Sequence, residues 1–324
     1  MNQRDSQYSL RQLKLPEDTE EAEFSIEHLG CNDLETDTIT ITPGEGIGGW
    51  FLIGATIIGE GHKEAGQICQ DAHAVTLLDS GWGVAVVSDG AGSADASHQA
   101  SAYIAQVMVR KAKEMLLQED WIVSASLPTA ATWKDAARGL FLEVRADLIE
   151  MAHNQEHTPE DFYATAILMI FSPAGILLAH IGDGRAGYLD DQDTWHAAMT
   201  PTVGEQVGQT VFVTSDLNAY PDLLGTSVIA ESVKAFTLMS DGCEHGCWLT
   251  VSFDQTTNTY HRVNLPHDDF FNTNIRYFKK MLADKEPIEI SGAWKTYLSE
   301  QNEAFRTESD DKTIIIGFRL DAEK

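Results

Sequence analysis

Aspartates stand beside five apolar runs of strand length in this sequence. Two of these runs continue into the same Ser-Asp-Gly tripeptide, and a third continues into Gly-Asp-Gly. The five residues are Asp71, Asp89, Asp183, Asp241 and Asp310. A single Asp-Gly at the end of a strand is ordinary turn chemistry, so the pattern gains meaning only as a set.

Carboxylates that converge at the ends of packed strands repel one another strongly unless a cation neutralises them. Mg²⁺ and Mn²⁺ bind carboxylate oxygens, backbone carbonyls and waters. Two such ions about 3.5–4 Å apart can activate a water and hold a phosphoryl oxygen. The set of aspartates therefore predicts a site for hard divalent cations, with phosphoryl chemistry as one possible use.

The composition limits the partners that this protein can have. Its 324 residues include 50 Asp and Glu against 22 Lys and Arg, for a net charge of −28. Nucleic-acid binding needs a basic surplus, so we expect no nucleic-acid partner. Residues 1–15 lack the apolar core of a signal peptide, no run reaches membrane-spanning length, and cysteines are few. These features predict a cytoplasmic protein that does not associate with membranes.

The chain divides into two parts by composition. Residues 1–49 form an acidic N-terminal arm that contains a short β-like run at residues 38–42, and residues 50–324 read as one globular domain. The 43% hydrophobic content is enough for a sizeable core. The sequence does not decide whether the arm packs on this domain or binds a partner.

Apolar periodicity predicts a cluster of strands, a pair of long helices, more strands and a second pair of helices. The predicted strands cover residues 51–58, 74–78, 84–87, 165–171, 175–181, 186–189, 210–214, 235–239 and 313–319. The predicted helices cover residues 94–117, 133–152, 271–282 and 294–305. This order favours α+β layers over a βαβ repeat.

Six short motifs occur in an order that resembles the protein phosphatase 2C family of metal-dependent Ser/Thr phosphatases. They are Gln70-Asp71, Ser88-Asp89-Gly90-Ala91-Gly92-Ser93, Thr165-Ala166, Gly182-Asp183-Gly184-Arg185, Ser240-Asp241-Gly242 and Asp310-Asp311-Lys312-Thr313. The likeness covers roughly residues 54–319 and is strongest to the bacterial branch, with a His-containing segment before Asp71. It implies a four-layer αββα sandwich, in which two packed antiparallel sheets are flanked by helix pairs.

The resemblance also implies roles for individual residues. Asp89 would bridge two Mn²⁺ or Mg²⁺ ions, and the Gly90 carbonyl would bind one of them. Asp241 and Asp310 would complete the other ion's shell, Asp71 would act through a bound water, and Asp183 would help to hold a third ion. The catalytic set would then be Asp71, Asp89, Asp241 and Asp310, hydrolysing phosphoserine or phosphothreonine in a protein substrate with metal-activated water. A cognate Ser/Thr kinase is the partner that this activity implies.

The sequence departs from the family pattern near Asp71. No Arg occurs between Gly54 and Asp71 to bind the substrate phosphate, and His62 or Lys63 could take over that contact. Gln70 stands where the family usually has Glu. These departures keep open a second reading, a weak or inactive phosphatase fold that binds a phosphoprotein or a kinase.

A third reading is a zinc hydrolase. His153 and His157 fit the H-x-x-E-H pattern, and Cys243 and Cys247 could supply half of a zinc site. Because the histidines end a helical pattern and no second cysteine pair exists, we expect an ordinary helix end and free thiols instead.

Overall fold

The computed structural model describes residues 38–42, 49–78, 80–202, 210–254 and 256–320. The described residues belong to one compact unit, Leu34–Lys324. The β-like run of the predicted arm is confirmed as strand β1 (Thr38–Thr42), which pairs with β2 of this unit. Most of the predicted arm lies outside the described residues, and the domain boundary at residue 49 stays a prediction.

Two antiparallel sheets contain most of the strands. In spatial order, one sheet has β1, β2 (Trp50–Ile57), β13 (Lys312–Arg319), β10 (Val233–Met239), β7 (Arg185–Asp190) and β8 (Trp195–Ala197). The other sheet has β3 (Asp71–Leu77), β4 (Gly83–Asp89), β5 (Ala166–Ser172), β6 (Gly175–Ile181) and β9 (Gly225–Ile229). A separate hairpin pairs β11 (Trp248–Asp254) with β12 (Thr259–Pro266).

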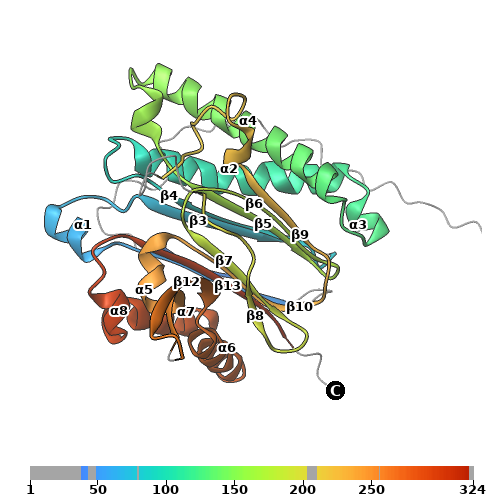
Figure 1. The fold of residues 1–324 in the computed structure, drawn as a ribbon, viewed down its shortest axis with the longest axis vertical. Coiled ribbons are helices and arrows are strands. Elements are labelled where there is room, and N and C mark those ends of the chain that lie inside the picture. Colours follow the sequence, from blue (N-terminus) through green and yellow to red (C-terminus); the bar gives the residue numbers. More distant parts are fainter. Residues whose placement is uncertain (1–37, 43–48, 79, 203–209, 255, 321–324) are drawn as a thin grey trace, which may run out of the picture. The chain divides into compact units, whose positions relative to one another are not determined.

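Helices lie on the outer faces of both sheets, as Figure 1 shows. The five-stranded sheet is covered by α2 (Ser97–Gln118) and α4 (Ala130–Asn154), with the short α3 (Trp121–Ser124) between them. The six-stranded sheet is covered by α6 (Asp268–Leu282), α7 (Pro287–Thr296) and α8 (Glu303–Arg306). Two further short helices, α1 (Glu60–Ala65) and α5 (Glu244–Cys247), lie in the connections beside strand ends.

Three apolar clusters hold these layers together. Successive side chains of a strand point to opposite faces, so β4 sends Val84 and Val86 toward α2 and α4 and Ala85 and Val87 toward the other sheet. A third cluster packs the outer face of the six-stranded sheet against Phe271 and its neighbours in the C-terminal helices. Strands buried on both faces read as continuous apolar runs, which explains why the sequence predicts them well. The predicted αββα sandwich is confirmed.

Two predicted elements are wrong in detail. Residues 210–214 form no strand, because Val213 makes a backbone bond to Ala164 while Phe212 stacks on Tyr163 instead of joining a ladder. The predicted helix 294–305 is broken into α7, a π-helical turn (Tyr297–Gln301) and α8. Asn302 ends the turn and caps α8 by accepting a bond from the backbone N–H of Ala304.

Four further elements have no clear signal in the sequence. The hairpin strands β11 and β12 are exposed along most of their length, so they lack the apolar periodicity of a half-buried strand. Helix α1 has no buried residue, and β9 is only half-buried. Within the described residues, no helix is long and apolar enough to cross a membrane.

Candidate active site

The aspartates predicted from the sequence come together in pairs at the ends of neighbouring strands. Asp71 begins β3 and Asp89 ends β4, and the two residues lie directly opposite each other in the antiparallel register. Asp241 follows β10 and Asp310 precedes β13, which are also antiparallel neighbours. Because one strand ends where its antiparallel neighbour begins, each pair shares one edge of its sheet.

A pocket of about 450 Å³ lies where these strand ends meet. Its lining includes four of the predicted aspartates, together with Gly90 and the predicted phosphate contact His62. The four are Asp89, Asp183, Asp241 and Asp310. Asp71 is not part of the lining, because its carboxylate is buried behind the pocket and accepts a hydrogen bond from the Ser240 hydroxyl at 2.7 Å.

Thr165 fixes the end of β4 next to the pocket. Its hydroxyl accepts a hydrogen bond from the backbone N–H of Asp89 at 3.1 Å, and its own N–H donates to the Asp89 carbonyl at 2.7 Å. The Ser88 hydroxyl donates to the Thr165 carbonyl at 2.6 Å. These bonds occupy the backbone N–H and carbonyl of Asp89. The Asp89 carboxylate is therefore the acceptor that this end of β4 presents to the pocket.

The glycines after Asp89 and Asp241 allow close backbone approach. A Cβ on Gly90 would lie 2.6 Å from the Gln70 carbonyl oxygen, and one on Gly242 would lie 2.0 Å from the Asp311 carbonyl oxygen. Gly90 thus brings the backbone after Asp89 against the residue before Asp71, and Gly242 brings the backbone after Asp241 against the residue after Asp310. The Asp-Gly pairs therefore bring the carboxylates together, because only glycine fits at these crossings.

Burial, followed by mutual repulsion, raises the pKa values of the aspartates in this site. Burial raises the pKa of Asp89 well above its ordinary value, and four other aspartates raise it further: Asp71, Asp241, Asp310 and Asp183. Burial, Asp183 and Asp310 together raise the pKa of Asp241 to about 6. Burial and the nearby Asp311 raise the pKa of Asp71, while hydrogen bonds from Ser240 and Thr313 oppose that rise.

The donor set fits a hard divalent cation. The Oδ1 atom of Asp241 is buried without a hydrogen-bond partner in the described structure, and three further aspartates, Asp89, Asp183 and Asp310, line the same pocket. A cation would neutralise charges that otherwise raise one another's pKa values. Within the described part of the chain, no three His, Cys, Asp or Glu side chains are gathered closely enough to share one ion.

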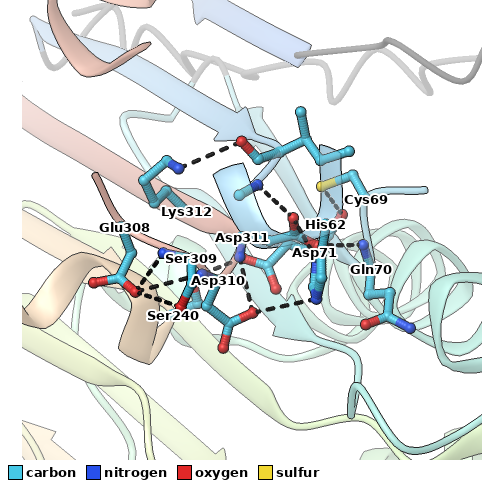
Figure 2. A network of polar contacts seen from close by, with 12 residues as sticks. His62, Cys69, Gln70, Asp71, Ser240, Glu308, Ser309, Asp310, Asp311 and Lys312 are labelled. Atoms are coloured by element: carbon cyan, nitrogen blue, oxygen red, sulfur yellow. Dashed lines mark hydrogen bonds and ion pairs between the residues drawn. The ribbon is translucent and has the colours of Figure 1, made fainter. Parts of the chain in front are cut away.

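Asp311 anchors helix α1 beside the pocket, as Figure 2 shows. Its buried carboxylate accepts hydrogen bonds from the backbone N–H groups of Gly59, at 2.8 Å, and Gln70, at 2.6 Å. The His62 ring lies beside the same carboxylate, with Nδ1 2.9 Å from Asp311 Oδ1 and Nε2 3.9 Å from Asp310 Oδ1. In the sequence, Asp311 is identified only as part of the motif Asp310-Asp311-Lys312-Thr313. Its anchoring role has no sequence signal, because it depends on backbone groups 241 and 252 positions away.

The two residues predicted as alternative phosphate contacts, His62 and Lys63, differ in their relation to the pocket. The Lys63 ammonium pairs with Glu60 at 3.0 Å and does not line the pocket, whereas His62 does. Arg185, which sequence reasoning left without a role, pairs with Glu244 at 2.6 Å and donates to the Asp183 carbonyl at 3.0 Å. It therefore braces the turn that carries Asp183.

The residues of the zinc reading do not assemble into a site. His153 is exposed at the end of α4, and His157 lies 3.3 Å from the carboxylate of Asp161. Cys243 and Cys247 are buried free thiols, as predicted. Burial raises the pKa of both thiols far above the ordinary value, so neither is a ready metal ligand.

Known proteins resemble this chain in sequence and in fold. The chain is 27% identical over 274 residues to serine/threonine-protein phosphatase 3 of Escherichia coli strain K12, covering 82% of this chain and 97% of that protein. Its fold resembles serine-threonine phosphatase 2C from Toxoplasma gondii, with a TM-score of 0.53 and 12% identity over 88% of this chain and all of that one. It also resembles PppA of Pseudomonas aeruginosa, a regulatory component of the T6SS, with a TM-score of 0.50 and 15% identity over 84% of this chain and 98% of that one.

The two structural likenesses show the fold, and the sequence of the chain shows the family. The family model described as protein phosphatase 2C matches residues 58–286, well over half of the chain. The matched region contains Asp71, Asp89, Asp183 and Asp241, and Asp310 follows it, just before β13, the strand next to β10. This chain belongs to the protein phosphatase 2C family of phosphoprotein phosphatases.

Proposed function

We propose that this protein is a Mn²⁺- or Mg²⁺-dependent serine/threonine phosphatase that uses a two-ion site to hydrolyse phosphoserine or phosphothreonine in a protein substrate. The observation that carries the proposal is the Asp89 carboxylate, whose pKa is raised by burial and by four further aspartates at the same strand ends. Such a cluster is costly unless cations neutralise it. The proposal includes a cognate Ser/Thr kinase and a cytoplasmic location.

Each residue of the proposed site has a distinct task. Asp89, with the Gly90 carbonyl, would hold both ions, and Asp241 and Asp310 would complete the shell of one of them. Asp71 would act from behind the pocket through a water, while Asp183 would hold a third ion. When bound, the ions would supply charge neutralisation for the phosphoryl oxygens and a lower pKa for the attacking water.

The remaining residues would orient the substrate. His62 lines the pocket on α1, so its imidazole is better placed than the paired Lys63 to contact the phosphoryl group. Phe212 and Thr210 line the same pocket from the connection before β9. The Thr210 hydroxyl donates to Asp183 Oδ2 at 2.5 Å and so orients that carboxylate.

Hydrolysis assays test the proposal. The protein would be given para-nitrophenyl phosphate and a phosphothreonine peptide with Mn²⁺, Mg²⁺, Zn²⁺ or a chelator. We expect turnover with Mn²⁺ or Mg²⁺ that both the chelator and Asp89→Asn abolish, with the fold of the variant intact. Folded wild-type protein that is inactive with every metal would favour the alternative, a phosphatase fold that only binds a phosphoprotein or kinase.

A further inference from the structure

Side-chain hydrogen bonds connect the edge strand β1 to Thr313, which adjoins the candidate metal site. The Thr40 hydroxyl lies 3.1 Å from His73 Nε2, and His73 Nδ1 lies 2.8 Å from the Thr56 hydroxyl. The Thr56 hydroxyl lies 2.9 Å from that of Thr313. Thr313 adjoins Asp71, because its backbone N–H donates at 3.0 Å to the Ser240 hydroxyl that donates to the Asp71 carboxylate, and the Thr313 side chain lowers the pKa of Asp71. The proposed function does not use Thr40, His73, Thr56 or Thr313.

The register of three strands places this chain across the inner face of the six-stranded sheet. Thr40 of β1 lies opposite Gly54 of β2, and Thr56 of β2 lies opposite Thr313 of β13. His73 comes from β3 of the other sheet and covers Gly54. A Cβ on Gly54 would lie 2.6 Å from the His73 ring, so the absent side chain leaves the space that the imidazole fills.

The chain has one consistent direction of donation. When a cation at the site keeps Asp71 ionised, its carboxylate only accepts, so the Thr313 hydroxyl donates to Asp71 and must accept from Thr56. The Thr56 hydroxyl then has to accept from His73 Nδ1–H. A neutral imidazole has one N–H, and Nε2 therefore accepts from Thr40. Burial lowers the pKa of His73 to about 4, which agrees with a neutral ring.

We propose that His73 is a positioning residue that orients the Asp71 carboxylate through Thr56 and Thr313 and so links strand β1 to the active site. The proposal rests on the proposed function in one respect, the role of Asp71 beside the metal ions. Within the described residues, the Ser240 hydroxyl also donates to this carboxylate. Loss of the Thr56 hydroxyl removes the bond that orients the Thr313 hydroxyl toward Asp71, so the carboxylate gains rotational freedom.

The tautomer of His73 tests the chain without any measurement of activity. Nitrogen NMR of histidine-labelled wild-type protein, assigned with His73→Gln, reports which ring nitrogen carries the proton. We expect the Nδ1–H tautomer at neutral pH. A ring protonated on Nε2 would reverse the direction of donation and overturn the proposal, whether or not the protein proves to be a phosphatase.

Thr56→Val tests the effect on the site, because valine keeps the shape of threonine and removes only the hydroxyl. Thr237→Val is the matched control: Thr237 is also buried in the six-stranded sheet, and its hydroxyl has no hydrogen-bond partner in the described structure. We expect Thr56→Val to raise the Mn²⁺ concentration for half-maximal activity by about tenfold, with a smaller change in kcat at saturating Mn²⁺. The control should change neither quantity.

Equal Mn²⁺ dependence of Thr56→Val and Thr237→Val would overturn the proposal. If Thr56→Val does not fold, Thr40→Val at the less buried end of the chain replaces it, with the same direction of change expected. If wild-type protein shows no turnover at all, the Mn²⁺ dissociation constant from calorimetry takes the place of the kinetic measurement. In that case the proposed function fails, while the tautomer and the binding shift still decide the role of His73.

Discussion

Replacing Asp241 by Asn should stabilise the metal-free protein while destroying its function. Burial, Asp183 and Asp310 raise the pKa of Asp241 from 3.8 to about 6. A shift of about 2 units corresponds to at most about 3 kcal/mol. Because Asp241 is partly exposed and solvent screens its charge, we expect a gain of about 1–3 kcal/mol from Asp241→Asn at neutral pH. In a chain of this size that gain raises Tm by about 2–10 °C.

The sign of this effect depends on pH. A carboxyl group whose folded-state pKa is raised is penalised above that pKa, and the penalty disappears below the unfolded value. The advantage of Asp241→Asn should therefore be full above about pH 6 and vanish near pH 4. Burial lowers the pKa values of His73 and His180 to about 4, so both wild-type and variant protein also lose stability through these histidines as the pH falls toward 4. The quantity to compare at each pH is therefore the difference in stability between wild-type protein and Asp241→Asn.

Thermal unfolding in chelator measures that difference, with phosphopeptide hydrolysis in Mn²⁺ measured alongside. Asp191→Asn is the matched control, because Asp191 is an exposed aspartate in the turn between β7 and β8. The control should change neither stability nor activity. Metal-free Asp241→Asn protein that melts at or below the wild-type temperature at neutral pH would refute the penalty that we assign to burial of this carboxylate beside Asp183 and Asp310.

Three further outcomes follow from the same geometry. Gly90→Ala should destabilise the protein by about 1–3 kcal/mol and abolish hydrolysis, since its Cβ would lie 2.6 Å from the Gln70 carbonyl oxygen; urea unfolding and turnover check both effects. His62→Ala should raise KM for a phosphothreonine peptide by about tenfold with a smaller effect on kcat, because the ring lines the pocket and adjoins Asp310. Adding Mn²⁺ at about one hundred times its Kd should stabilise wild-type protein by about 2.7 kcal/mol, and Asp89→Asn should lose this gain in a thermal shift assay.

The sequence predicts the site well because its aspartates are local features of strand ends. Asp89 and Asp241 stand at the ends of apolar runs that are buried on both faces, so the strands and their ends can both be predicted from the sequence. Antiparallel pairing then brings each of them to the partner that begins the neighbouring strand. The resemblance carried by the order of the motifs adds the rest, because it implies two packed antiparallel sheets flanked by helix pairs.

Other parts of the molecule depend on contacts between distant residues, which no local pattern reports. Asp311 anchors backbone groups of Gly59 and Gln70, and His73 joins β1 to the site across two sheets. The segment at 210–214 looks like a strand because it is β-branched and apolar, yet it packs beside the pocket. Its environment overrides its intrinsic preference.

Calorimetric titration with Mn²⁺ tests whether Asp89 is the centre of a two-ion site. Wild-type protein and the Asp191→Asn control should each bind about two ions per chain in the site, and Asp89→Asn should lose both because the bridging carboxylate is gone. Circular dichroism would establish that the variant is folded. Mn²⁺ binding by folded Asp89→Asn with unchanged stoichiometry and affinity would contradict the assignment of the metal site to these strand ends.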